Sequence, residues 1–76
     1  MRFDRITIDP RRMNGQPCVR DLRITVRRVL EILATYPDRA TIRQEYPALE
    51  DEDIVHALGY AAAMLEDVVV ELPKTG

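Results

Sequence analysis

Three kinds of side chain in this 76-residue sequence could do chemistry: one histidine, one cysteine and a run of carboxylates. His56 could act as a general base, but Glu52, four residues earlier on the same predicted helix, would give only a surface pair with no nucleophile. Cys18 could act as a nucleophile beside Arg20, yet no partner base is evident. We therefore interpret Cys18 as a buried structural thiol and predict that the chain is not an enzyme.

The carboxylates of residues 50–53 are consecutive in the sequence EDED. On a helix, adjacent side chains point in different directions and do not converge on one metal ion. These acids suit the positive end of a helix dipole instead. Gly15 by itself does not make a phosphate-binding loop. The sequence therefore predicts no metal and no cofactor.

The charges are divided between the two halves of the chain. Residues 1–28 hold eight arginines and three aspartates, a formal charge of +5, whereas residues 29–76 hold three bases and ten acids, a formal charge of −7. A basic half is typical of a nucleic-acid-binding face, although the same arginines could pair with carboxylates. The candidate DNA-contacting residues are Arg11, Arg12, Arg20, Arg23, Arg27 and Arg28.

The basic half must be held by short strands and a turn. Alternating apolar residues predict strands over 5–9 and 18–26. Between them, Asn14 and Gly15 tolerate positive φ, and Pro17 restricts the residue before it to extended conformations. We expect this turn, with its motif residues Gly15, Pro17 and Cys18, to aim the arginines outward from a helical body.

Helical spacing of apolar residues predicts three helices after the strands. The first starts after an N-cap at Thr25 and stops before Pro37. The second begins after Asp38 and closes at Tyr46, and the third follows the loop 46–50. The predicted buried stripes are Val26, Val29, Leu30, Leu33 and Ala34 on the first helix, and Ile54, Leu58, Ala61, Ala62 and Leu65 on the third. The acids at the start of the third helix would repel phosphates, so we do not expect it to act as a recognition helix.

The length predicts one domain, with a strand and turn arm (1–26), a three-helix body (26–66) and an apolar tail (67–76). The tail carries a candidate partner-binding segment, Val68, Val69, Val70 and Leu72, followed by Lys74. Such a strand could add to the edge of another protein's sheet, or it could pack on its own domain. A single cysteine and the lack of a long apolar stretch favour a reducing, cytoplasmic setting without a membrane.

Several motifs follow one another as in a known protein family. They are "ITIDP" (6–10), "GQPCVR" (15–20), "RITV" (23–26), "VLEILA" (29–34), "YPAL" (46–49) and "DIVHALGYA" (53–61). Over residues 5–62 the chain resembles the small bacterial family called domain of unknown function 433. The resemblance places Gly15, Pro17, Cys18, Arg20 and Arg23 on the family motif and assigns no catalytic residue. Glu50 stands where the family often has a Ser or Thr helix cap, and it is a weaker cap.

The resemblance implies a helix-turn-helix-like homodimer that acts as the antitoxin of a nuclease resembling the PIN-domain fold. Together with the pattern of elements, it predicts a mainly α fold with a small β element: a three-helix, helix-turn-helix-like domain preceded by a short N-terminal strand or hairpin region. The expected function is an antitoxin-like regulator that holds the nuclease through its tail and operator DNA through its basic half.

Two other functions stay open. One is a stand-alone DNA-binding transcriptional regulator. The other is a structural or adaptor homodimer without a nucleic-acid role, which predicts that the arginines pair with acids inside the fold. In that case Arg20 and Arg23 would brace carboxylates such as Asp9 and Asp21 rather than bind phosphates.

Overall fold

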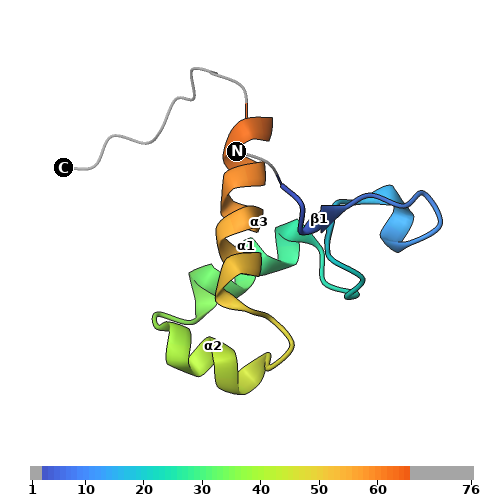
Figure 1. Ribbon diagram of the computed structural model, residues 1–76. Helices are drawn as coiled ribbons and strands as arrows, with labels where there is room; N and C mark the ends of the chain where they lie inside the picture. The colour runs from blue at the N-terminus through green and yellow to red at the C-terminus, as the bar shows by residue number, and fades with distance from the viewer. Residues whose placement is uncertain (1–2, 66–76) are drawn as a thin grey trace.

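A computed structural model describes residues 3–65 and shows a mainly α fold, with a small β element ahead of three helices (Figure 1). The elements in order are β1 (Ile6–Thr7), the 3-10 turn η1 (Met13–Gly15), β2 (Cys18–Val19), α1 (Val26–Thr35), α2 (Arg39–Glu45) and α3 (Asp51–Met64). The predicted fold class is therefore confirmed. The candidate partner-binding residues of the tail, Val68, Val69, Val70, Leu72 and Lys74, lie outside the described residues.

The two strands pair antiparallel but are shorter than predicted. Ile6 lies opposite Val19 and Thr7 lies opposite Cys18. The expectation of a strand over 18–26 is wrong because Arg20 adopts a left-handed φ of 47°, which turns the chain. After this turn the chain returns to form a single bridge between Cys18 and Thr25, one residue before α1.

A projecting loop connects β1 to β2 (Figure 1). Three successive residues in it, Met13, Asn14 and Gly15, have positive φ angles of 52°, 58° and 77°. The predicted positive φ at Asn14-Gly15 is thus confirmed. A Cβ on Gly15 would lie an unstrained 3.7 Å from the Cα of Pro10, so glycine is required there for its backbone conformation and not for space.

The N-caps predicted for the first two helices are present. Thr25 Oγ1 accepts a hydrogen bond from the Arg28 amide at 3.0 Å, and Asp38 Oδ1 accepts one from the Thr41 amide at 2.7 Å. The amide of Thr41 lowers the pKa of Asp38. At α3 Glu50 and Asp53 form a reciprocal capping box, in which the Asp53 side chain accepts a hydrogen bond from the Glu50 amide at 2.9 Å.

The core lies where α1 packs against α3, closed by residues from β2, α2 and the loop before α3. Its buried apolar residues are Val19, Val26, Val29, Ile32, Ile42, Leu49, Ile54 and Ala57. The predicted stripes are therefore only partly correct: Ile32 is buried although it was not predicted, and Ala34, Leu58, Ala62 and Leu65 are exposed. The face of α3 turned inward runs through Asp53, Ile54 and Ala57, which rotates Leu58 and Ala62 out toward solvent.

None of the helices formed by residues 3–65 is long and apolar enough to cross a membrane.

Candidate nucleic-acid interface

The carboxylate of Asp53 is fully buried where the N-terminal arm meets α3. Arg20 binds it with both ends of its guanidinium, from Nε to Oδ1 at 3.0 Å and from Nη2 to Oδ2 at 2.8 Å. Arg5 donates from Nη1 to Oδ1 at 2.8 Å. With the amide of Glu50, the two oxygens of Asp53 accept four hydrogen bonds. One carboxylate thus joins both strands of the arm to the first turn of α3.

The charges in this cluster stabilise one another. Burial alone would raise the pKa of Asp53, but hydrogen bonds from Arg20, Arg5 and the Glu50 amide outweigh it and lower that pKa to about 2. The pKa of Arg5 is raised by its hydrogen bonds to Glu50 and Asp53, and that of Arg20 by its hydrogen bond to Asp53. All three groups are therefore ionised at neutral pH, and the buried carboxylate is compensated by two cations.

Arg5 and Arg20 are close because of the strand register. Ile6 opposite Val19 places Arg5 opposite Arg20, and the Arg20 amide donates to the Arg5 carbonyl at 2.6 Å. Two like charges at facing positions repel unless an opposite charge lies between them. Asp53 supplies that charge, so the pair of arginines and the carboxylate form one unit.

The remaining acids at the start of α3 are also paired. Arg5 contacts Glu50 at 2.6 Å and Glu52 at 3.5 Å. Asp51 is 3.1 Å from Arg43 and 3.7 Å from Arg39. The acids that were expected to repel phosphates at this end of the helix are therefore held in ion pairs. Four arginines balance four carboxylates here, which leaves the start of α3 without the excess positive charge that a phosphate-binding helix end needs.

The predicted partners of Arg20 are corrected by this geometry. Asp9 is 3.5 Å from Arg11, and Arg20 contacts Asp53, which is 33 residues further along the chain. Nε and Nη2 of Arg20 are both engaged, with Asp53 and the Ala48 carbonyl, so Arg20 is an internal ion-pair partner and a poor candidate for phosphate contact. The sequence analysis did not include Arg5 among the functional residues. Arg5 lies just before a predicted strand, but only the register of the two strands places it opposite Arg20.

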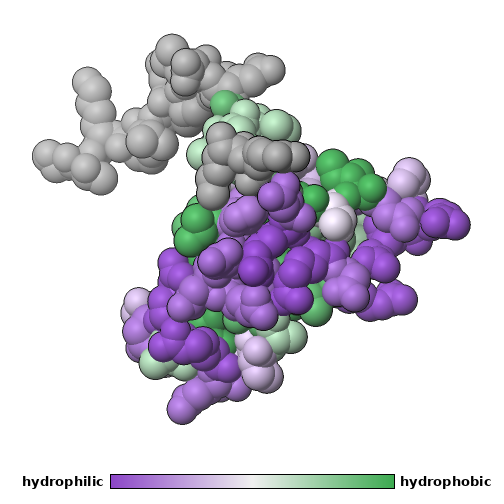
Figure 2. Space-filling model, viewed as in Figure 1, coloured by the Kyte–Doolittle hydropathy of each residue, from purple (hydrophilic) through white to green (hydrophobic). Residues whose placement is uncertain are grey.

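Three of the candidate DNA-contacting residues have no carboxylate partner within residues 3–65: Arg12, Arg23 and Arg27. Arg12 immediately precedes η1, Arg23 lies in the turn after β2, and Arg27 lies in the first turn of α1. Hydrophilic surface covers the projecting end of the arm (Figure 2). The two other candidates are engaged at the surface: Arg11 with Asp9, and Arg28 with Glu31 and the hydroxyl of Tyr46.

The family model described as "Protein of unknown function (DUF433)" matches residues 6–61 of the chain. The chain belongs to the DUF433 family. The match runs from the start of β1 through all three helices to the last turn of α3. No curated protein and no solved structure matches the chain.

In this DUF433 domain the motif residues Gly15, Pro17 and Cys18 join the arm to α1. The carbonyl of Pro17 accepts a hydrogen bond from the Val26 amide at 2.9 Å. Cys18 is only 2% exposed and its thiol donates to the carbonyl of Gln16 at 3.4 Å. Cys18 is therefore a buried thiol in the position predicted for it, and the motif fixes how the arm enters the first helix.

His56 lies half-buried on α3, and its Nδ1 is buried without a hydrogen-bond partner among the described residues. Within residues 3–65 no three side chains of His, Cys, Asp or Glu come together as metal ligands would.

Proposed function

We propose that this DUF433 domain is an antitoxin-like, non-enzymatic regulator. Its basic N-terminal half, residues 1–28, contacts operator DNA, and its segment 68–72 holds a nuclease partner that resembles the PIN-domain fold. The observation that supports DNA contact is the set of arginines without carboxylate partners: Arg12, Arg23 and Arg27. The support for the nuclease partner is the apolar sequence of the tail and the family resemblance.

The ion pairs limit how much DNA contact the arm can make. Of the nine arginines in residues 3–65, six are paired with carboxylates and three are not. Each phosphate that a free arginine neutralises contributes about 0.9 to the slope of log affinity against log salt concentration. Three contacts per chain therefore correspond to a slope of roughly −2.7 per chain.

The test is a salt titration of binding to the promoter region of the chain's own gene. Replacing Arg12, Arg23 and Arg27 together with Ala should weaken binding to all duplexes alike. It should also make the slope of log affinity against log salt concentration less negative by about 2.7. The matched control replaces Arg11, Arg28 and Arg39, which removes the same charge from arginines that already have surface partners. Equal losses in the two triple variants would show that only net charge matters and would contradict a site made by the three arginines without carboxylate partners.

The adaptor function has one observation in its favour, which is that two thirds of these arginines are already paired within the fold. It predicts that the unaltered chain does not retain DNA even at low salt. The same titration therefore separates the two functions.

The nuclease partner is tested by co-expression with the product of the neighbouring gene. The full chain should co-purify with that product, and a variant with Val68, Val69 and Val70 replaced by Ser should not. Lys74→Glu should weaken the complex, because the charge of Lys74 would no longer complement an acidic metal site. If the full chain does not co-purify, the nuclease proposal fails while the DNA proposal stands. If it co-purifies but does not bind DNA, the DNA proposal fails while the nuclease proposal stands.

A further inference from the structure

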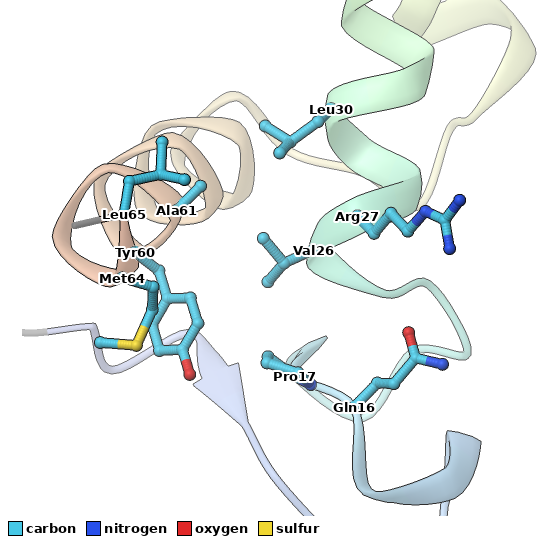
Figure 3. A pocket seen from close by; sticks show the side chains of 9 residues that line it. All are labelled: Gln16, Pro17, Val26, Arg27, Leu30, Tyr60, Ala61, Met64 and Leu65. Atoms are coloured by element: carbon cyan, nitrogen blue, oxygen red, sulfur yellow. The ribbon is translucent and has the colours of Figure 1, made fainter. Parts of the chain in front are cut away.

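An apolar groove of about 350 Å³ opens between α1 and the C-terminal half of α3. Figure 3 shows Val26 and Leu30 of α1 facing Tyr60 and Met64 of α3 across the open space, with Leu65 at its end. Met64 is 59% and Leu65 is 77% exposed. The ring of Tyr60 is held in place by an edge-on contact with Phe3 at 5.7 Å. The groove is thus a formed apolar surface that residues 3–65 leave open.

We propose that the chain's own segment 68–72, with the sequence VVVEL, fills this groove when no protein partner is bound. The described chain ends at Leu65, which itself lines the groove. Three further residues span at most about 10 Å, so the first valine is within reach of the groove wall. Covering the exposed side chains of Met64 and Leu65 with valines removes apolar surface from water, which is the main driving force for such packing.

The charges favour the same occupant. The one charged side chain that lines the groove is Arg27, whose guanidinium extends outward at the rim and has no carboxylate partner within residues 3–65 (Figure 3). Residues 66–72 carry three acids and no base. A valine segment seated between α1 and α3 brings Glu71 toward this rim, where it supplies the missing partner.

A second copy of the chain is a poorer occupant of the same groove. Its exposed apolar helix surface would come from α3, and residues 54–65 carry no Asp, Glu, Lys or Arg. Packing this uncharged stretch into the groove leaves Arg27 without a carboxylate. The inference concerns the chain with neither nuclease nor DNA bound, and it implies that Arg27 is released from Glu71 before it contacts a phosphate.

The test is disulfide trapping in the full chain at low micromolar concentration. In the double variant Ala61→Cys/Val69→Cys, one cysteine lines the groove and the other belongs to the segment. The control is Ala62→Cys/Val69→Cys, whose helix cysteine is exposed, does not line the groove and is almost equally far from residue 69 in sequence. Mild oxidation should close the groove pair at least tenfold faster than the control pair, as read by mass spectrometry of the monomer.

Two results would overturn the proposal. Equal closure rates would mean that the segment has no preference for the groove, and disulfides formed mainly between chains would make a second copy the donor of the segment. A second pair, Leu30→Cys/Val69→Cys against Glu31→Cys/Val69→Cys, repeats the comparison from α1 in case a variant of α3 fails to fold.

An independent measurement uses the methyl resonances of the full chain. Replacing Val68, Val69 and Val70 with Ser should shift the methyl signals of Val26, Leu30 and Met64. The methyl signals of Val55, which is exposed on α3 but does not line the groove, should stay in place. Unchanged signals at the groove would contradict the proposal.

Discussion

Asp53 stabilises the fold through two arginines, Arg5 just before β1 and Arg20 just after β2. Asp53→Asn leaves no charge in the interior, because Arg5 and Arg20 are themselves partly exposed, but it removes the carboxylate that both arginines bind. Losing these charge-assisted hydrogen bonds should lower the free energy of unfolding by about 2 kcal/mol, measured by urea denaturation. Asp51→Asn is the matched control, since Asp51 is exposed and pairs only at the surface, so it should leave the stability almost unchanged. Similar losses in both variants would contradict an anchoring role for Asp53.

The pKa of Asp53 also predicts how stability depends on pH. It is about 2 in the folded chain, against about 3.9 for an unfolded aspartate. Because the folded value is the lower one, the unfolded chain binds more protons in between, so this contribution is fully present above about pH 5 and is lost as pH falls toward 2. The loss should be on the order of 2 kcal/mol. As pH decreases from about 6 to about 2, the urea midpoint should fall more steeply for the unaltered chain than for Asp53→Asn. Equal dependence of the midpoint on pH in the two proteins would contradict this role of Asp53.

At the scale of the elements, α1 depends on a cap that joins it to the arm. Thr25 closes the first turn of α1 through its hydroxyl, and its backbone bridges to Cys18. Thr25→Ala removes the hydrogen bond to the Arg28 amide and should cost about 1 kcal/mol. Thr25→Ser keeps the hydroxyl and should retain most of the stability. Thermal melts of the two variants make the comparison, and equal destabilisation would mean that the lost methyl group matters more than the cap.

Features decided within a few residues of sequence were predictable. The caps at Thr25 and Asp38 and the positive φ at Asn14-Gly15 all depend on local chemistry, and all are present. The length of the second strand was not predictable, because Arg20 adopts a left-handed conformation that costs an ordinary side chain energy and is held by contacts elsewhere.

The candidate site could be predicted only in part, because it too depends on contacts between residues far apart in the sequence. An excess of arginine in the first 28 residues is visible in the sequence, but which arginines are free depends on partners that fold against them. Arg5 and Arg20 are separated from Asp53 by 48 and 33 residues, and no local pattern links them. The buried face of α3 was misjudged because a charged residue, Asp53, occupies an inward position that a hydrophobic pattern assigns to solvent.

For the molecule as a whole, the arm and the helices differ in how they are held. The helices share an apolar core, whereas the arm has a two-residue ladder, the buried side chains of Cys18 and Val19, and the ion cluster at Asp53. Regions with few buried apolar contacts open at lower free energy than the core. Amide hydrogen exchange should therefore be faster in β1 and β2 than in α1. Asp53→Asn should increase the exchange rate of the arm more than that of the helix. An equal increase in the exchange rates of the arm and of α1 would show that they open as one unit.

The position of the anchor also constrains the order in which the molecule is completed. Ribosomes make proteins from the N-terminus, so both strands of the arm emerge before the residue that will hold them exists. Asp53 accepts the Glu50 amide as well as the two arginines, and its carboxylate is in place only after the first turn of α3 has formed. The arm is therefore synthesised before its anchor and docks only after α3 has begun to form, and until then its guanidinium groups are exposed to whatever anions the nascent chain meets.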